Sequence, residues 1–146
     1  MKAYDKALYH LSRYPKTTAK IREYLLDKDY ARDEIEEAIT LLITQKVLND
    51  EEYISLYFES EVIRKWKSVM NIRNKLRQKW AERDMIDAYV ENNEEVLNSA
   101  MKKWISRSIT QLIARWTAPR EIIRKVTTKG YPYGLVKEVY ELMEEE

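Results

Sequence analysis

Two basic tracts are the residues whose type and spacing best suit chemistry, and that chemistry is the binding of an anionic partner. Residues 64–83 hold eight Lys or Arg side chains against Glu82, and residues 102–129 hold eight against Glu121. Each tract therefore carries a net charge of +7, although the whole chain carries only +1. Such side chains neutralise phosphates or complement an acidic protein surface. The candidate partner-binding or DNA-binding residues are Arg64, Lys65, Lys67, Arg73, Lys75, Arg77, Lys79, Arg83, Lys102, Lys103, Arg107, Arg115, Arg120, Arg124, Lys125 and Lys129.

Aromatic side chains are interleaved with these tracts, since Trp66, Trp80, Trp104 and Trp116 all lie within or beside them. An exposed tryptophan can stack on an unpaired base, which adds single-stranded DNA to the candidate partners. The competing interpretation makes the tryptophans core anchors, and we favour it because four are few for the core. For the basic side chains, partner binding and ordinary solvated helix faces both stay open.

Catalytic and metal chemistry has little support in the sequence. His10 is the single histidine and has no nucleophile motif near it, while the absence of cysteine excludes thiolate catalysis and cysteine-bound zinc. Gly130 and Gly134 do not form a phosphate-binding loop. The carboxylate runs at residues 33–37 and 144–146 match no metal-site spacing and suit solvated faces. We therefore expect a protein that is not an enzyme and has no cofactor or metal.

Composition favours a helical, soluble chain. Hydrophobic residues make up 45% and charged residues 35%, with only two glycines and three prolines. A β-rich fold needs turn residues at frequent intervals, and they are missing here. No apolar run is long enough for a signal peptide or a membrane span, and the lack of cysteine fits a reducing compartment. We expect an all-α, cytoplasmic monomer that does not associate with membranes.

An internal repeat organises the chain. Three segments beginning at Ile21, Ile72 and Ile122 carry apolar residues at positions i, i+4, i+14 and i+18, with a lysine at i+7. The starts are 51 and then 50 residues apart. Apolar residues four apart share one helix face, and a lysine suits the negative end of a helix dipole. Each segment therefore predicts two helices joined by a short turn.

Cap residues support these helices. Thr17 or Thr18, Ser68 and Thr117 are candidate N-caps for the first helix of each pair. Gly130 stands where a glycine would end the third of these helices.

A further helix is predicted upstream of each pair, so each repeat has three helices. The first upstream helix ends before Pro15, and the third begins as early as Val96. Its apolar stripe comprises Ile105, Ile109, Leu112, Ile113 and Trp116. The predicted units are residues 1–47, 48–92 and 93–146. Three short helices bury little surface alone, so we expect the units to stack into an elongated, curved array.

The order of these segments is similar to that of the RecX family of RecA regulators. The resemblance starts with residues 7–13 (ALYHLSR), 15–17 (PKT) and 25–30 (LLDKDY). It continues with residues 35–39 (IEEAI) and with the entry to the second unit at residues 48–53 (LNDEEY). Each motif alone is weak, but their order and spacing together are moderately specific.

Later segments extend the resemblance over nearly the whole chain. Residues 72–79 (IRNKLRQK) and 129–138 (KGYPYGLVKE) match the family pattern in the second and third units. Departures occur at residues 67–70 (KSVM), where a small or glycine-rich basic turn is usual, and at Asp29, where the family often has glycine. Trp80 stands at the matching place in the second unit.

The resemblance implies a regulator that acts in DNA repair, homologous recombination and the SOS response. It implies binding to the groove of the RecA–single-stranded-DNA filament, with inhibition of ATP hydrolysis, strand exchange and coprotease activity and a block to filament extension. Two alternatives stay open: a nucleic-acid-binding helical-repeat module that acts independently of RecA, and a scaffold for another partner.

Specific reading of duplex DNA is disfavoured. The second helix of each pair is acidic or apolar at residues 35–38, 86–89 and 136–139, whereas a recognition helix must approach the phosphates and present polar side chains to the bases.

Overall fold

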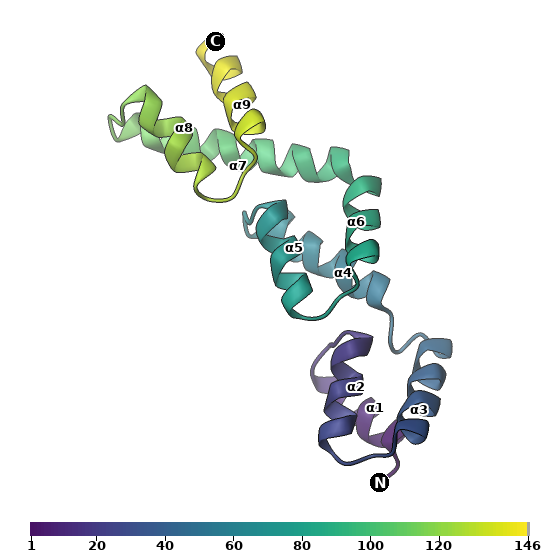
Figure 1. Ribbon diagram of the computed structural model, residues 1–146. Helices are drawn as coiled ribbons and strands as arrows, with labels where there is room; N and C mark the ends of the chain where they lie inside the picture. The colour runs from purple at the N-terminus through teal and green to yellow at the C-terminus, as the bar shows by residue number, and fades with distance from the viewer. Residues whose placement is uncertain (146) are drawn as a thin grey trace. The chain divides into compact units, whose positions relative to one another are not determined.

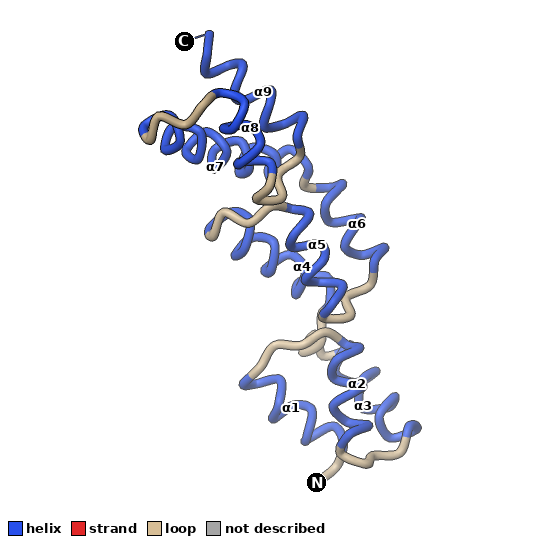
Figure 2. Tube along the Cα trace, turned by 60° about the vertical axis from the view of Figure 1, so that its left-hand side comes forward, coloured by secondary structure: helices blue, strands red, loops and turns tan. Residues whose placement is uncertain are grey.

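The fold is all-α, as the sequence predicts. A computed structural model describes residues 1–145, which form helices and connecting loops and contain no strand (Figure 1, Figure 2). The elements are α1 Ala3–Arg13, α2 Thr18–Asp27, α3 Arg32–Thr44, α4 Asp50–Phe58, the π-helix η1 Glu59–Arg64, α5 Val69–Gln78, α6 Arg83–Asn92, α7 Glu94–Ala114, α8 Pro119–Thr127 and α9 Tyr133–Glu145. None of the helices in residues 1–145 is both long and apolar enough to cross a bilayer.

The helix boundaries confirm the predicted repeat. Helices α2, α5 and α8 begin 51 and then 50 residues apart, and α3, α6 and α9 begin at the same two spacings. The turn inside each pair holds one residue with a positive φ: Asp29 at 65°, Trp80 at 63° and Gly130 at 101°. Each of these residues directly follows the repeated lysine, so the same left-handed step ends α2, α5 and α8.

The chain divides into two compact units. The first comprises Met1–Leu56 and Leu76–Tyr89, and the second comprises Tyr57–Lys75 and Val90–Glu146. The residues between the first and last helix trios are thus shared between the two units. The predicted three-unit boundaries after residues 47 and 92 stay a prediction.

In the first unit, α1 packs against α2 and α3, and α2 packs against α3 (Figure 1). Ala3 and Ala7 are fully buried on α1, and their small side chains allow the helix to lie close to its neighbours. Isoleucines and leucines three or four positions apart supply the facing stripes on α2 and α3. The core residues are Ala3, Ala7, Ile21, Leu25, Ile35, Ala38, Ile39, Leu42 and Leu48.

In the second unit, α7, α8 and α9 pack against one another, and η1 packs against α7. The long helix α7 supplies most of the apolar surface because its buried residues recur every three or four positions along four turns. The buried apolar residues of these three helices are Leu97, Met101, Trp104, Ile105, Ile109, Ile122, Val126, Val136 and Val139.

Two of the three predicted caps are confirmed. Thr17 Oγ1 accepts a hydrogen bond from Lys20 N at 3.3 Å, and Ser68 Oγ accepts one from Asn71 N at 3.1 Å. The third prediction is wrong, because the residue that caps α8 is Ala118 rather than Thr117 and makes no side-chain hydrogen bond.

The third upstream helix also differs from its prediction at both ends. Helix α7 begins at Glu94, two residues before Val96, and ends at Ala114. Ile113 is 52% exposed and Trp116 is 93% exposed, so neither belongs to the buried stripe. The helix ends before Trp116 because Trp116 adopts a left-handed φ of 60° and Thr117 N donates to Leu112 O, which closes the last turn of α7.

The π-helix η1 continues directly from α4 and was not predicted. Val62 is fully buried within it, and Lys67 N donates to Glu61 O at 3.0 Å just beyond its end. A π-helix places more residues in each turn than an α-helix and leaves carbonyl groups at its end that need other donors.

Candidate partner and nucleic-acid interface

Each compact unit contains a hydrogen bond from the start of one repeat helix to the carbonyl of the repeated lysine that follows another, although the donors occupy different repeat positions. In the first unit, Thr17 Oγ1 at the start of α2 donates to Lys79 O, just after α5, at 2.9 Å. In the second unit, Asn71 Nδ2 near the start of α5 donates to Lys129 O, just after α8, at 3.1 Å. The positive end of one helix dipole thus meets the negative end of the next, which favours both hydrogen bonds.

A cluster of aromatic and basic side chains lies in the second unit. The rings of Trp66 and Trp104 are stacked, with centroids 4.0 Å apart and planes 17° apart. The Arg107 guanidinium lies 5.0 Å from the Trp104 centroid and 5.7 Å from that of Trp66. Lys103 Nζ lies 5.1 Å from the Trp104 ring. Stacking and cation–π attraction hold these four side chains together.

Backbone carbonyl groups at the end of η1 position this cluster. The buried Trp104 donates from Nε1 to Val62 O at 3.2 Å, and the Tyr131 hydroxyl donates to Trp66 O at 2.6 Å. Burial raises the pKa of Tyr131, so the hydroxyl keeps its proton and remains a donor. Trp66 itself has a φ of 70°, and these two donors stabilise the turn that contains this left-handed residue.

The second basic tract lies on α7, α8 and the residues that follow each helix. Lys102 pairs with Glu138 at 3.3 Å, Arg124 pairs with Glu121, and Lys129 Nζ contacts Ser108 Oγ at 3.3 Å. The five remaining members have no ion pair within residues 1–145, and all five are exposed. These members are Lys103, Arg107, Arg115, Arg120 and Lys125.

The first basic tract is divided between the two compact units. Its members from Arg64 to Lys75 belong to the second unit, and those from Arg77 to Arg83 belong to the first. Lys65 pairs with Glu61 at 3.3 Å, and Arg83 lies 3.8 Å from Asp87. The first basic tract is therefore continuous in the sequence, but neither compact unit contains all of it.

The core-anchor interpretation of the tryptophans is right for one residue and wrong for another. Trp104 is only 7% exposed, whereas Trp116 is 93% exposed. Trp66 and Trp80 lie between these extremes, at 37% and 47%. The Lys20 ammonium covers Trp80, with Nζ 4.0 Å from the ring centroid.

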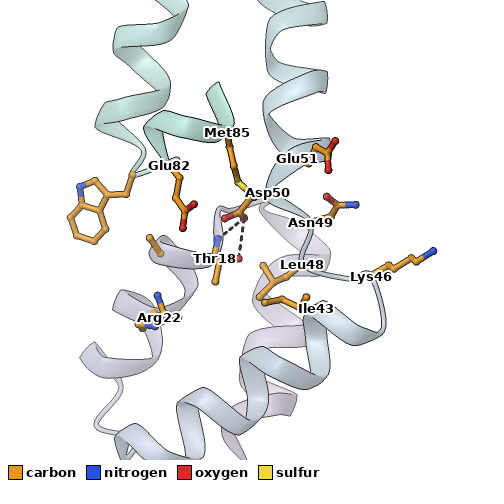
Figure 3. Close-up of a pocket in the computed structure, with 12 residues that line it drawn as sticks. Thr18, Arg22, Ile43, Lys46, Leu48, Asn49, Asp50, Glu51, Glu82 and Met85 are labelled. Carbon is orange, nitrogen blue, oxygen red and sulfur yellow. Dashed lines mark hydrogen bonds between the residues drawn. The ribbon is translucent and has the colours of Figure 1, made fainter. Parts of the chain in front are cut away.

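A pocket of about 440 Å³ lies in the first unit. Asp50 Oδ1 accepts hydrogen bonds from Thr18 N at 2.8 Å and from Thr18 Oγ1 at 3.0 Å (Figure 3). Arg22 lies on one side and Glu82 on another, so the lining mixes both charges (Figure 3). None of the sixteen predicted basic site residues lines this pocket.

His10 takes part in packing. Its ring is stacked on Tyr24, with centroids 3.9 Å apart. Burial and then the nearby Lys16, Lys28 and Lys6 lower the pKa of His10, so the neutral imidazole is favoured. Within residues 1–145, no group of three or more His, Cys, Asp or Glu side chains is arranged to hold a metal ion.

Comparison with known proteins relates this chain to RecX proteins. Residues 3–42 match the RecX first three-helix domain. The chain is 23% identical over 141 residues to the regulatory protein RecX of Streptococcus gordonii, covering 92% of this chain and 53% of that protein. It is 28% identical over 133 residues to RecX of Streptococcus pneumoniae serotype 19F, covering 90% of this chain and 51% of that protein.

The chain resembles RecX proteins over most of its length. The crystal structure of RecX from Lactobacillus salivarius matches the fold with a TM-score of 0.87 at 20% identity, covering 99% of this chain and 96% of that one. A second RecX crystal structure matches with a TM-score of 0.74 at 23% identity, covering 99% and 70%. The chain spans about half the length of the curated RecX relatives it matches.

Proposed function

We propose that this chain is a regulator that binds the RecA–single-stranded-DNA filament and inhibits it. Bound in the filament groove, the chain reduces ATP hydrolysis, strand exchange and coprotease activity and blocks filament extension. The proposal treats α1–α3, α4–α6 and α7–α9 as three repeated binding units acting in the cytoplasm. Inhibition then needs occupancy of an interface and no catalytic group.

The observation that carries this proposal is similarity along most of the chain to proteins named as regulatory RecX proteins. That similarity spans 88% to 94% of this chain in the relatives compared. Use of the equivalent lysine carbonyl as an acceptor in both compact units supports a repeat protein, and repeat proteins commonly bind partners over extended surfaces.

The exposed cations of the second basic tract support an anionic partner. Lys103 and Lys125 lie on α7 and α8 without an ion pair in the described chain. Unpaired surface cations speed association with an acidic groove or a phosphate backbone, and salt screens that attraction over about 8 Å at physiological ionic strength. The proposed interaction should therefore weaken as salt is raised.

The test is ATP hydrolysis by purified RecA on single-stranded DNA, with the chain added up to equimolar amounts. We expect hydrolysis to fall and the chain to co-sediment with the filament. A double variant, Lys103→Glu with Lys125→Glu, should inhibit less. The matched control is Lys137→Glu on α9, whose Nζ lies 3.9 Å from Glu141 and is already near an acid. Unchanged hydrolysis together with no co-sedimentation would overturn the proposal.

A second candidate function is nucleic-acid binding that does not require RecA. The stacked Trp66 and Trp104 rings beside Arg107 favour it, because aromatic rings and cations together suit single strands. Tight binding of bare single-stranded DNA at about 0.15 M salt, without any effect on RecA, would favour this function over the first.

A further inference from the structure

Trp66 and Trp116 occupy the same backbone position in successive repeats. They lie 50 residues apart, have φ values of 70° and 60°, and each stands three residues before the helix that follows it, α5 or α8. Their rings have different surroundings. The Trp66 ring is stacked on Trp104, whereas the Trp116 ring is 93% exposed. The repeat thus presents one tryptophan to an internal partner and the other to solvent.

The loop that carries Trp116 is held by its backbone. Trp116 N donates to Ile113 O at 3.0 Å, and Thr117 N donates to Leu112 O at 3.1 Å. A left-handed conformation is unfavourable for a residue with a Cβ. With nearly all of its surface in solvent, the indole returns little packing energy to the fold. The ring is therefore presented from a fixed turn without a structural contact that requires it.

Cations flank the exposed ring. Arg115 precedes it at the C-cap of α7, and Arg120 follows in the first turn of α8. Both are exposed and neither has an ion pair within residues 1–145. The one acid in the tract, Glu121, is bonded to Arg124. Trp116 is therefore an exposed aromatic side chain with an exposed, unpaired arginine directly before it and another four residues after it.

The chain itself shows what a tryptophan at this position contacts. Trp66 meets a flat aromatic ring at 4.0 Å, with the Arg107 guanidinium beside the pair. An unpaired nucleobase presents a flat aromatic face, and its phosphates are the natural partners of Arg115 and Arg120. Bases inside a duplex are already stacked, so their faces are not available. An apolar protein pocket would accept the indole but would have to desolvate two guanidinium groups beside it.

We propose that Trp116, Arg115 and Arg120 form a contact site for single-stranded nucleic acid. One base stacks on the indole, and neighbouring phosphates pair with the two guanidinium groups. Within the proposed function, this site assigns the contact with the filament's DNA to the turn between α7 and α8. Binding to bare DNA does not require RecA, so the two proposals can fail separately.

The test is fluorescence anisotropy of a labelled single-stranded oligonucleotide titrated with the full chain at several salt concentrations. Trp116→Ala should weaken binding about 5- to 100-fold, the effect of losing one stacked base, and Trp116→Phe should weaken it less. Leu142→Ala is the matched control, since Leu142 is an apolar side chain in the same unit and is 54% exposed. That control should bind within about twofold of the unchanged chain.

Salt dependence separates stacking from charge. Each lost phosphate contact lowers the slope of log affinity against log salt by about 0.7 on a single strand. The double variant Arg115→Ala with Arg120→Ala should therefore reduce the slope by about 1.4, while Trp116→Ala should leave it unchanged. Circular dichroism and the urea midpoint should match those of the unchanged chain, because all three side chains are exposed.

Three results would overturn the proposal. The first is failure of the chain to bind the oligonucleotide, or binding by Trp116→Ala within twofold of the unchanged chain. The second is an equal loss by Trp116→Ala on duplex DNA. The third is a Trp116→Ala variant that no longer co-sediments with RecA but still binds DNA, which would assign Trp116 to a protein contact. Inhibition of RecA ATP hydrolysis by the unchanged chain would leave the proposed function standing in each case.

Discussion

Replacing Thr17 by valine tests whether the hydrogen bond from Thr17 to Lys79 holds the first unit together. Valine keeps the volume of the fully buried side chain and removes only its hydroxyl. That hydroxyl accepts from Lys20 N at 3.3 Å and donates to Lys79 O at 2.9 Å. Loss of an N-cap costs about 1 kcal/mol, and loss of the longer-range hydrogen bond costs about 1 kcal/mol more. The free energy of unfolding of the first unit should fall by about 2 kcal/mol.

The measurement must resolve the two compact units, because a single unfolding transition does not describe such a chain. Hydrogen–deuterium exchange at the peptide level does this. Thr17→Val should reduce protection in peptides covering residues 18–27 and 76–82, both in the first unit, and leave residues 119–127 unchanged. The opening free energies of those peptides directly give the decrease in the stability of the first unit.

Thr18→Val is the matched control for this change. Thr18 Oγ1 donates to Asp50 Oδ1 at 3.0 Å, but Thr18 N donates to the same oxygen at 2.8 Å and is kept in the variant. The control should lose about 1 kcal/mol or less. The reasoning fails if Thr17→Val loses less than about 0.5 kcal/mol, or if Thr18→Val loses as much as Thr17→Val.

Three further changes follow from the same structure. Ala118→Ser should stabilise α8 by about 1 kcal/mol, measured as opening free energy in α8 peptides, because φ −61° and ψ 139° already suit a capping side chain; no gain in protection would contradict this. Gly130→Ala should destabilise the second unit in urea unfolding by at least about 1 kcal/mol, since φ is 101° and a Cβ would lie 2.5 Å from Ser68 Oγ. His10→Gln should flatten the pH dependence of stability. Because the pKa of His10 is lowered in the folded chain, the unfolded chain takes up a proton at a higher pH than the folded chain does. The unchanged chain should therefore lose stability as the pH falls below about 6.5. An equal loss in both chains between pH 7.5 and 5.5, measured by urea midpoints, would contradict the last prediction.

The repeat and its helices were predictable because burial imposes a period on the sequence. Ile21, Ile72 and Ile122 are all nearly or fully buried, and each begins a stripe that the fold uses as expected. The Thr17 cap was predictable for a similar reason, because capping depends on residues only three apart in the chain. Apolar periodicity and capping residues predict local structure correctly when tertiary packing favours the same conformation.

The candidate site was less accessible to sequence reasoning. The stacking of Trp66 on Trp104 joins residues 38 positions apart, and no short-range spacing indicates it. Trp116 was placed in the core because the apolar stripe of α7 was extended past the end of the helix. The sequence carries no usual signal for this helix end, because the left-handed residue that follows α7 is a tryptophan rather than a glycine or asparagine.

The π-helix also explains why the repeat spacing changes from 51 to 50. Eight positions separate the buried Phe58 from Trp66, but only seven separate the buried Ile109 from Trp116. The longer stretch in the second repeat contains η1, whose wider turn accommodates one more residue while both tryptophans keep the same left-handed geometry. Two repeats that differ by one residue in this stretch therefore present the same left-handed turn before α5 and α8.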